Sequence, residues 1–407
     1  LLIVPSVWRT FDYEGLARQV ATDVEGMEVL VADQTLPEGD PATLPSLPEP
    51  PGSPADAPVR WLFFTSGTTS EPKGVMHTDR SIMAAARAST IGSRTGPDDV
   101  SPVVFPFTHV GGPMNLASGL MTACKLIAIE AFDPVATSDL IKREGCTLAG
   151  AGTVFHLAYL AEHRKRPDEK LFATVRYLPG GGAPKPPELF YELKAEIGAP
   201  IISGYGLTES PLLTGNQLEY PDEALAHTEG RAVDGVELKL VRLDGTIAGP
   251  GEEGEIRAKA PQMFRGYLDS SLDADAFDDE GFFRTGDLGV RDAEGFVTIT
   301  GRLKDVIIRK GENIAAKEVE DLLYGHAKVV DAAVIGMPDP RLGERCCAIV
   351  VPKDPADPLG MAEMIEYLKG AGLMVQKIPE QLVHVDALPR NPAGKVLKHE
   401  LRARFAR

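Results

Sequence analysis

The segment from Thr65 to Gly74 constrains this chain more than any other stretch of its sequence. It reads Thr-Ser-Gly-Thr-Thr-Ser-Glu-Pro-Lys-Gly and follows the apolar run 61–64, which predicts a buried strand. Hydroxyl groups and backbone N–H groups can surround phosphate oxygens, and a lysine can neutralise their charge. The segment therefore predicts a chain that handles a nucleoside triphosphate.

A P-loop is one alternative for this segment, because Lys73 has the spacing of that motif when counted from Gly67. The residue before the lysine is Pro72, which has no N–H to offer a phosphate. The residue after it is Gly74, which lacks the hydroxyl that would hold Mg²⁺. Both mismatches argue against a P-loop. The other alternative is an ordinary polar loop, and four further segments argue against that reading.

The composition is that of an ordinary globular protein with an acidic net charge. The chain has 407 residues, 43% hydrophobic and 25% charged, and this length predicts two or three domains. Its 42 basic and 59 acidic residues give a net charge of −17, which argues against nucleic acid or an anionic membrane as the main partner. We find no apolar run long enough to span a membrane, no signal peptide, and no metal or disulfide spacing among the four cysteines. A reducing, cytoplasmic setting is the simplest expectation.

Apolar runs alternate with helical patterns between residues 59 and 200. Helices are expected at 80–88 and 186–197, and strands at 103–105, 126–129, 175–178 and 200–202. Such alternation predicts an α/β fold with a largely parallel sheet. The proline-rich stretch 37–58 predicts a surface linker, and the opening residues 1–5 predict a buried strand.

The pattern changes at about Val236, where short alternating strands begin. They are expected at 236–241, 254–259 and 295–299, and their turn residues predict a small β-barrel or meander. After Arg302 a last α/β portion follows, with helices near 316–324 and 361–370 and strands at 332–335 and 347–351. We expect a domain boundary at about 301–305.

Two glycine-rich segments follow predicted strands. Residues 204–210 read Gly-Tyr-Gly-Leu-Thr-Glu-Ser, and two glycines around a tyrosine let the backbone approach a flat ligand on which the ring can stack. Thr208 can hydrogen-bond a phosphate, and the Glu209 carboxylate can hold Mg²⁺. Residues 180–184, Gly-Gly-Gly-Ala-Pro, suit a ligand lying flat on the main chain. Taken alone, each segment is also compatible with a tight turn.

Four single residues in short motifs complete the set. Asp287, expected in a tight turn, can accept two hydrogen bonds from a ribose diol, and Arg302 can reach a ribose or phosphate. Lys395 lies at the tip of a loop flanked by proline and glycine, and His109 lies in the aromatic segment 105–112. Read alone, these are a turn aspartate, a surface arginine and lysine, and a packed histidine.

Taken together, these segments resemble the signature motifs of the acyl-adenylate-forming enzymes, the AMP-binding superfamily of acyl-CoA synthetases, nonribosomal adenylation domains and beetle-type luciferases. One departure is Ser70, where the family usually has glycine. The resemblance implies an α/β fold with a large N-terminal lobe of α/β subdomains, a small β-barrel-like subdomain, and a small mobile α+β C-terminal domain. The implied domains are 1–301, incomplete at its start and β-rich from about 230, a hinge at 302–306, and 307–407. Since family members carry a long segment before this point, we expect the chain to be a fragment.

The resemblance also implies a nucleotide site. The residues expected to bind ATP are Thr65, Ser66, Gly67, Thr68, Thr69, Lys73, Gly181, Gly182, Ala183, Gly204, Tyr205, Gly206, Thr208, Asp287, Arg302 and Lys395. Tyr205 would stack on adenine, Thr208 would contact the α-phosphate, Asp287 would bind the ribose, and Glu209 would be the Mg²⁺ ligand. The expected catalytic residues are Lys395, Thr208, Glu209 and Lys73.

The remaining roles implied by the resemblance concern the acid and the thiol. His109, Val110, Gly111 and Gly112 would form the acyl pocket, with the two glycines leaving room for the acyl group. Lys304 would be the hinge between two arrangements of the domains, and Gly311 would line the tunnel for the pantetheine arm of coenzyme A. No aspartate that could hold an ammonium group appears near His109, which argues against an amino-acid substrate.

The expected function is that of an ATP-dependent acyl-CoA synthetase, a ligase of fatty acid metabolism that forms an acyl-adenylate and releases AMP and pyrophosphate. Its substrates would be a small carboxylic acid, ATP and CoA, with Mg²⁺ as cofactor, and a homodimer is compatible with the resemblance. The alternatives are an enzyme that loads an acyl group onto a carrier protein, a luciferase-like oxygenase, and a non-catalytic AMP-binding module. The presence of Lys73, Glu209, Asp287, Arg302 and Lys395 argues against the last of these.

Overall fold

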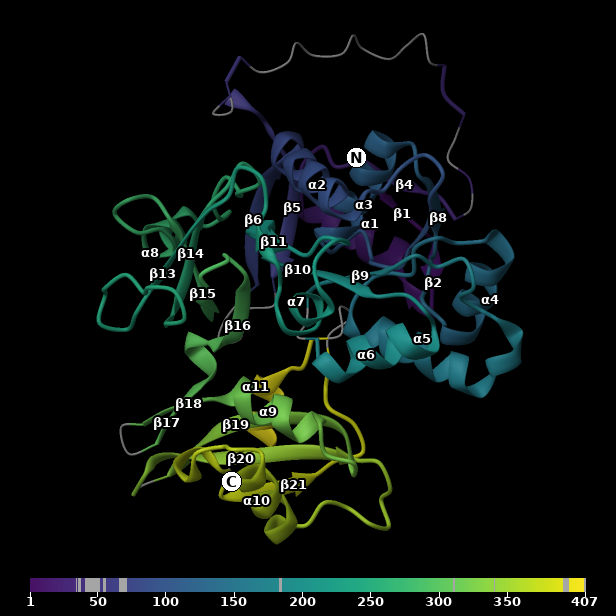
Figure 1. Ribbon diagram of the computed structural model, residues 1–407. Helices are drawn as coiled ribbons and strands as arrows, with labels where there is room; N and C mark the ends of the chain where they lie inside the picture. The colour runs from purple at the N-terminus through teal and green to yellow at the C-terminus, as the bar shows by residue number, and fades with distance from the viewer. Residues whose placement is uncertain are drawn as a thin grey trace. The chain divides into compact units, whose positions relative to one another are not determined.

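The computed structural model describes residues 1–33, 35, 38–40, 52–53, 56–65, 72–182, 185–309, 312–339, 341–390 and 395–405 (Figure 1). The chain forms two compact units, Leu1–Asp56 and Ala57–Arg407. The first unit contains helix α1 (Tyr13–Asp23) and strands β1 (Leu2–Val4), β2 (Val7–Trp8), β3 (Phe11–Asp12) and β4 (Val29–Val31). Strand β1 pairs in parallel with β4, so the opening strand is confirmed, but Leu1 and Ile3 are exposed rather than buried. Most of the predicted linker lies outside the described residues.

The second unit begins with the hairpin that carries the first motif. Its first elements are β5 (Val59–Thr65), β6 (Lys73–Thr78), α2 (Asp79–Ser93), β7 (Val100–Val103), α3 (Gly111–Thr122), β8 (Lys125–Ala128), α4 (Pro134–Glu144), α5 (Thr153–Lys165) and a 3₁₀ helix at Pro167–Glu169. The antiparallel pairing of β5 with β6 sets Thr65 opposite Lys73. The strand over 61–64 is confirmed, but it is only half-buried: Phe63 is buried, whereas Leu62 and Phe64 are 43% and 61% exposed. Such alternation is typical of a strand with one covered face.

A four-stranded sheet carries the second motif. It consists of β9 (Leu178–Gly180), β10 (Ile201–Leu207), β11 (Ser210–Gly215) and β12 (Arg231–Ala232), with helices α6 (Pro187–Glu196) and α7 (Asp222–His227) in the connections. Strands β9 and β10 pair in parallel, as do β7 and β8, which agrees with the parallel pairing predicted from residues 59–200. The β5–β6, β10–β11 and β11–β12 pairs are antiparallel. The motif is not a loop after the strand. Residues 204–207 belong to β10 itself, and Thr208 and Glu209 form the turn to β11.

The next part of the unit is an antiparallel meander. Its elements are β13 (Glu237–Val241), β14 (Glu253–Lys259), a 3₁₀ helix at Ser270–Leu272, α8 (Asp273–Ala276), β15 (Phe283–Arg291) and β16 (Val297–Arg302). The strands pair in chain order. Of the two predicted alternatives, a small β-barrel or a meander, the structure therefore shows the meander. Asp287 was expected in a tight turn, but it lies within β15, directly opposite Arg302 on β16. The local irregularity is instead a register shift beside it and a positive φ of 69° at Gly286.

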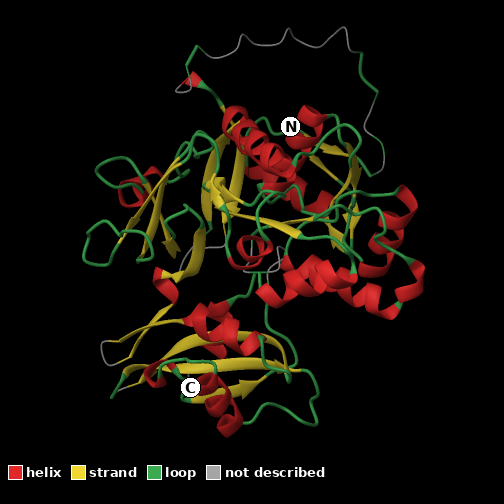
Figure 2. Cartoon of the chain, viewed as in Figure 1, coloured by secondary structure: helices red, strands yellow, loops and turns green. Residues whose placement is uncertain are grey.

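The C-terminal part is a five-stranded sheet with helices on both faces. Its elements are a 3₁₀ helix at Leu303–Asp305, β17 (Val306–Arg309), β18 (Glu312–Ala315), α9 (Ala316–Tyr324), β19 (Val329–Asp339), β20 (Gly343–Pro352), α10 (Met361–Gly370), a 3₁₀ helix at Val375–Lys377, β21 (Gln381–His384) and α11 (Lys398–Phe405). Figure 2 shows the long strands β19 and β20 side by side. Cys346 packs with α9 and α10 on one face, and Cys347 packs with α11 on the other, as the period of two in a strand requires. Both thiols are fully buried, which agrees with a packing role.

The α/β fold class and the separate α+β C-terminal part are confirmed, whereas the predicted domain boundaries stay a prediction. Among the described residues, none of the helices combines the length and the apolar character needed to span a bilayer.

Candidate active site

Three of the predicted site residues meet around the carboxylate of Asp287. The Tyr205 hydroxyl donates to Asp287 Oδ2 at 2.7 Å, and Arg302 Nε lies 2.6 Å from Oδ1. Asp287 is only 3% exposed, since β10, β15 and β16 each bring one of these side chains to the same place. A carboxylate can accept about four hydrogen bonds, so Asp287 keeps capacity for a ligand such as a ribose hydroxyl.

Burial and charge fix the protonation of this cluster. Burial, and then the Asp287 carboxylate, raise the pKa of Tyr205 well above its usual range, so its phenol remains a donor. Burial opposes the charge of Arg302, but the Asp287 carboxylate raises the pKa of the guanidinium above its ordinary value. The cluster is therefore an ion pair held by a neutral phenol.

A chamber of about 300 Å³ adjoins the cluster, and we call it the nucleotide chamber. The predicted site residues that line it are Gly182, Gly204, Tyr205, Gly206, Asp287, Arg302, Lys304 and Lys395. A Cβ added at Gly206 would meet the carbonyl group of Pro211, and one at Gly204 would lie 2.8 Å from the Thr214 carbonyl oxygen. These two glycines are therefore required by the close approach of β11, a reason that the sequence does not show.

The cations of the chamber repel one another. Burial, followed by the charges of Arg302 and Lys304, lowers the pKa of Lys395 to about 8. Burial and then the charge of Arg302 also lower the pKa of Lys304, which lies in the 3₁₀ helix directly after β16. A phosphate chain would relieve this repulsion, so the residues present fit a nucleotide triphosphate.

A second cluster joins the first and second motifs. Tyr267 donates its hydroxyl proton to Glu209 Oε1 at 2.7 Å, and Lys73 Nζ lies 5.0 Å from the centroid of the same ring. Burial, and then Glu209, raise the pKa of Tyr267. Backbone pairing holds the three together, because Val75 on β6 bridges to Tyr267, and the Glu209 carbonyl accepts from the N–H of Phe264 at 2.8 Å. Tyr267 lies outside every motif recognised in the sequence.

His77 is a further residue that the sequence motifs did not reveal. Its side chain is fully buried, with Nε2 at 2.7 Å from the Thr208 carbonyl oxygen and Nδ1 at 2.9 Å from Ser81 Oγ. Burial lowers the pKa of His77 to about 4, so the ring is neutral near pH 7. Because a carbonyl only accepts, Nε2 carries the proton. The Nδ1 atom of the neutral ring is left as an acceptor facing the Ser81 hydroxyl, whose single proton the Thr78 carbonyl can also accept at 2.9 Å. His77 thus anchors the turn at Thr208 to the start of α2.

The part of the chain that the structure describes contains no group of three His, Cys, Asp or Glu side chains able to hold a metal ion. Glu209 would be a single protein ligand. Mg²⁺ commonly binds through one or two carboxylates together with substrate phosphates and water. The site therefore fits a metal ion that arrives with the nucleotide.

The residues predicted for the acyl pocket are packed at the start of α3. His109 stacks on Phe105 with 5.0 Å between ring centroids, and its Nδ1 accepts from the Gly111 N–H at 3.0 Å. A Cβ at Gly112 would lie 2.8 Å from the Pro106 carbonyl oxygen, so the expectation that this glycine leaves room for an acyl group is wrong. Val110 is buried in an apolar cluster beside Phe63 and Ile82. None of the four predicted residues is among those that line the nucleotide chamber.

Several predicted residues lie outside the described residues: Ser66, Gly67, Thr68, Thr69, Ala183 and Gly311. Thr65, the last residue of β5, directly precedes Ser66. Gly181 directly precedes Gly182, and a Cβ added at Gly181 would lie 3.2 Å from the Gly204 carbonyl oxygen.

Comparison with known proteins identifies the class of this protein. Residues 6–268 match the AMP-binding enzyme family, and residues 318–395 match the AMP-binding enzyme C-terminal domain. The chain belongs to the family of AMP-binding enzymes, and the resemblance inferred from its motifs is confirmed.

Individual relatives show how much of the enzyme the chain covers. It is 36% identical to the medium-chain fatty-acid–CoA ligase of Escherichia coli over 84% of the chain, and this match spans 60% of that ligase. It is 33% identical to the salicyl-AMP ligase / salicyl-S-ArCP synthetase of Mycobacterium tuberculosis over 98% of the chain and 71% of that protein. Among solved structures it resembles ATP-bound MatB from Rhodopseudomonas palustris, with 31% identity, a TM-score of 0.79, and coverage of 85% of this chain and 68% of that one.

Proposed function

We propose that this chain is the core of an ATP-dependent acid–thiol ligase, an acyl-CoA synthetase that works through an acyl-adenylate. The observation that carries the proposal is the meeting of Tyr205, Asp287, Arg302 and Lys395 at one chamber, although they come from segments far apart in the sequence. An aromatic ring, a carboxylate and two cations are the groups that an adenine, a ribose and a phosphate chain require. Family membership and the ATP-bound relative support this assignment.

In the first step, a carboxylate oxygen of the acid attacks the α-phosphorus of ATP, and the bond from that phosphorus to the pyrophosphate oxygen breaks. Lys395 and Lys73 would counter the charge on the phosphoryl oxygens, and Thr208 would donate a hydrogen bond to the α-phosphate. Mg²⁺ bound at Glu209 would neutralise part of the phosphate charge. His77 would keep Thr208 in place through its carbonyl oxygen.

In the second step, the sulfur of a thiol attacks the acyl carbon, the mixed anhydride bond breaks, and AMP leaves. Lys395 has no role in this step. We propose that the C-terminal part turns at Lys304 to withdraw Lys395 and to bring the segment at Gly311 to the thiol, because one small site cannot hold both sets of groups. Free coenzyme A is the proposed thiol.

A carrier protein is the second candidate acceptor. The relative from M. tuberculosis is named for both an AMP ligase and a carrier-loading reaction, and it matches 98% of this chain. Both candidates share the adenylation step, so they differ only in which thiol accepts the acyl group.

Isotope exchange between pyrophosphate and ATP, dependent on an added carboxylic acid, tests the adenylation step directly. We expect exchange with the unmodified protein. Thioester formation with CoA, measured in competition with a phosphopantetheinylated carrier, then distinguishes the two acceptors. Binding of AMP without exchange for any acid in a broad panel would show a non-catalytic AMP-binding module and would reject the proposal.

A further inference from the structure

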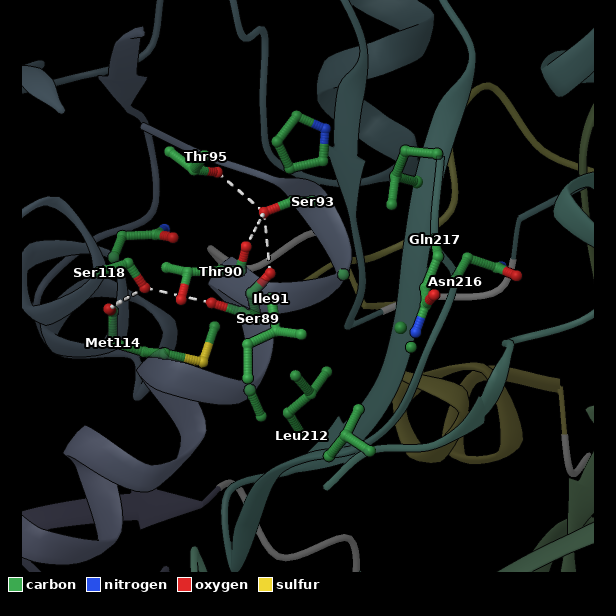
Figure 3. A pocket seen from close by; sticks show the side chains of 18 of the residues that line it. Ser89, Thr90, Ile91, Ser93, Thr95, Met114, Ser118, Leu212, Asn216 and Gln217 are labelled. Carbon is green, nitrogen blue, oxygen red and sulfur yellow. Dashed lines mark hydrogen bonds between the residues drawn. The ribbon is translucent and has the colours of Figure 1, made fainter. Parts of the chain in front are cut away.

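A second chamber of about 280 Å³ lies next to the nucleotide chamber, and Gly204 lines both. Its walls come from helices α2 and α3 and from strands β9 to β11 (Figure 3). A residue without a side chain therefore stands between the two chambers. A carboxylate near Gly204 could face the nucleotide while the rest of the acid occupied the second chamber. We call this space the hydroxyl chamber, after Ser89, Ser93, Thr95 and Ser118 in its lining.

Three serine hydroxyls of this lining, those of Ser89, Ser93 and Ser118, already use their protons. Ser89 donates to the Ala86 carbonyl at 2.8 Å, Ser93 donates to the Ser89 carbonyl at 2.8 Å, and Ser118 donates to the Met114 carbonyl at 2.9 Å. Such bonds to the preceding helical turn are common for serine. A hydroxyl has one proton but two lone pairs, so each oxygen keeps the capacity to accept.

A chain of hydroxyls extends the same pattern to the sheet side of the chamber. Ser93 Oγ lies 2.8 Å from Thr95 Oγ1 (Figure 3). Thr95 Oγ1 in turn lies 2.9 Å from the Tyr177 hydroxyl. Since Ser93 gives its proton to its helix, Thr95 donates to Ser93 and Tyr177 donates to Thr95. Burial raises the pKa of Tyr177, so the phenol keeps this proton. The donors are again engaged within the protein.

Asn216 adds an acceptor without any donor. It is 3% exposed, and its Nδ2 donates to Ser203 Oγ at 3.1 Å and to the Thr228 carbonyl at 2.9 Å. These two bonds fix which end of the amide is the oxygen, because a carbonyl only accepts. Asn216 Oδ1 has no hydrogen-bond partner in the described part of the chain. Buried polar atoms of this kind are rare in proteins. Arg231 Nε is a second unpartnered polar atom of this lining, and it is a donor.

We propose that the hydroxyl chamber holds the body of the acid and selects acids that carry a hydroxyl group away from the carboxyl group. This inference rests on the proposed function. The lining offers hydroxyl oxygens that can accept and amide and guanidinium groups that can donate, and a hydroxyl group can do both. A plain alkyl chain would leave these polar groups without hydrogen bonds. The volume is at the lower end of the roughly 300–1,000 Å³ of small-molecule sites, which favours a ring or a short chain.

Charged tails are the main competitors for this chamber. Arg231 and Asp234 are its charged lining residues, one of each sign. The guanidinium of Arg231 stacks over Phe296 at 4.2 Å and Tyr220 at 5.3 Å from the ring centroids, and its buried Nε has no hydrogen-bond partner in the described part of the chain. An ammonium or a second carboxylate would lose its water and face a lining of nearly zero net charge. A neutral hydroxyl avoids that penalty.

The test compares matched acids in pyrophosphate exchange with the unmodified protein. Each hydroxybenzoate and each short hydroxyalkanoate is paired with the acid in which a methyl group or a second carboxylate replaces the hydroxyl. We expect the best hydroxy acid to exceed both partners in kcat/KM by at least about tenfold, because a site built around a hydrogen bond rejects analogues that lack it. Equal rates, or a preference for the alkyl or dicarboxylic partner, would overturn the inference while leaving the proposed function intact.

Two variants on α3 sharpen this comparison. Ser118→Ala removes one acceptor from the chamber and should lower the preference for the hydroxy acid several-fold. Thr122→Ala is the matched control, since Thr122 makes the same kind of bond, to the Ser118 carbonyl at 2.8 Å, from outside the chamber lining. Thermal melting checks that both variants are folded, and an equal loss of preference in the two would count against the chamber.

If no acid supports exchange, the proposed function fails, and direct binding still tests the chamber. Calorimetric titration of the unmodified protein with the same acid pairs, without nucleotide, should show tighter binding of the hydroxy acid. Equal affinities, or no binding of any pair, would overturn the inference on its own.

Discussion

The two chambers are neighbours that share Gly204, yet several charged side chains line the nucleotide chamber and mainly uncharged ones line the hydroxyl chamber. The nucleotide chamber gathers Arg302, Lys304 and Lys395 about a buried carboxylate, and burial and mutual repulsion shift the pKa values of its lysines. The hydroxyl chamber has one charged residue of each sign in its lining, and the hydroxyl protons of Ser93 and Ser118 are engaged within the protein. The difference suggests a division of work: one chamber stabilises the charge of a reacting phosphate, and the other recognises an uncharged body by hydrogen bonds.

The largest expected effect comes from removing Lys395, one of the cations of the nucleotide chamber. Lys395→Ala should reduce adenylation, measured as pyrophosphate exchange, by about a hundredfold or more, because a preorganised charge at the transition state is lost. Thioester formation from supplied acyl-adenylate should be nearly unchanged, and so should the preference among acids. An equal loss of adenylation and of thioester formation would contradict the proposal that Lys395 acts only in the first step. It would also contradict the proposed rotation of the C-terminal part at Lys304.

The contrast between the chambers also explains what the sequence could predict. The residues of the nucleotide chamber lie in short contiguous motifs, because a phosphate chain needs glycine, hydroxyl and lysine groups on one loop or strand end. Tyr205, Asp287, Arg302 and Lys395 were all assigned from such motifs, and the structure brings them to one chamber. The hydroxyl chamber is lined by single residues on helices and strands. Their importance depends on which carbonyl takes each proton, and no spacing records that.

Other misses have similar physical causes. Parallel and antiparallel strands both read as short apolar runs, so the sequence did not distinguish the parallel β9–β10 pair from the antiparallel β10–β11 hairpin. Tyr267 and His77 act through one hydrogen bond each, to Glu209 and to the Thr208 carbonyl, across long sequence separations. The glycine at 112 was taken for open space, but backbone packing fills that space.

A pair of buried histidines offers the next test, because each holds one carbonyl beside one chamber. His77 Nε2 lies 2.7 Å from the Thr208 carbonyl oxygen, and His156 Nε2 lies 2.9 Å from that of Pro179, a residue that lines the hydroxyl chamber. Burial lowers the pKa of each ring from 6.5 to about 4. Each of these histidines therefore binds a proton near pH 6.5 in the unfolded chain but only near pH 4 in the folded chain. The contribution of the two neutral rings to the free energy of unfolding should be fully present above about pH 6.5 and should decrease as the pH falls toward about 4.

Each histidine should account for a loss on the order of 3 kcal/mol across that pH range. His77→Gln and His156→Gln should each flatten the pH dependence of the free energy of unfolding, measured with urea between about pH 4 and 7. Their activities should differ: His77→Gln should lower kcat for adenylation, and His156→Gln should mainly raise KM for the acid. If both variants changed only stability, with kcat and KM untouched, the link between these carbonyls and the chambers would be rejected.

A smaller effect is expected from the anchor of the nucleotide chamber. Asp287→Asn keeps the shape of the side chain but removes the charge that pairs with Arg302 at 2.6 Å. The KM for ATP should rise about tenfold or somewhat more, since hydrogen bonds to charged groups contribute about 1.5–3 kcal/mol. Tyr205→Phe removes only the 2.7 Å bond from the phenol and should have a weaker effect in the same direction. The preference among acids should not change in either variant, and a large change would mean that the chambers do not act separately.

The last expected effect is a pH dependence that belongs to the nucleotide chamber alone and is small close to pH 8. The pKa of Lys395 is lowered to about 8, so its ammonium is progressively lost as the pH rises above that value. Since kcat/KM reports the free enzyme, adenylation measured as kcat/KM for ATP should fall by up to about tenfold per pH unit beyond it. Thioester formation from supplied acyl-adenylate should lack this pH dependence. In the hydroxyl chamber burial raises the pKa of Tyr177, so the preference for a hydroxyalkanoate over its methyl analogue should stay constant between about pH 7 and 9. If this preference instead fell above pH 8 together with kcat/KM for ATP, Lys395 would also affect the choice of acid. The proposed division between the two chambers would then be wrong.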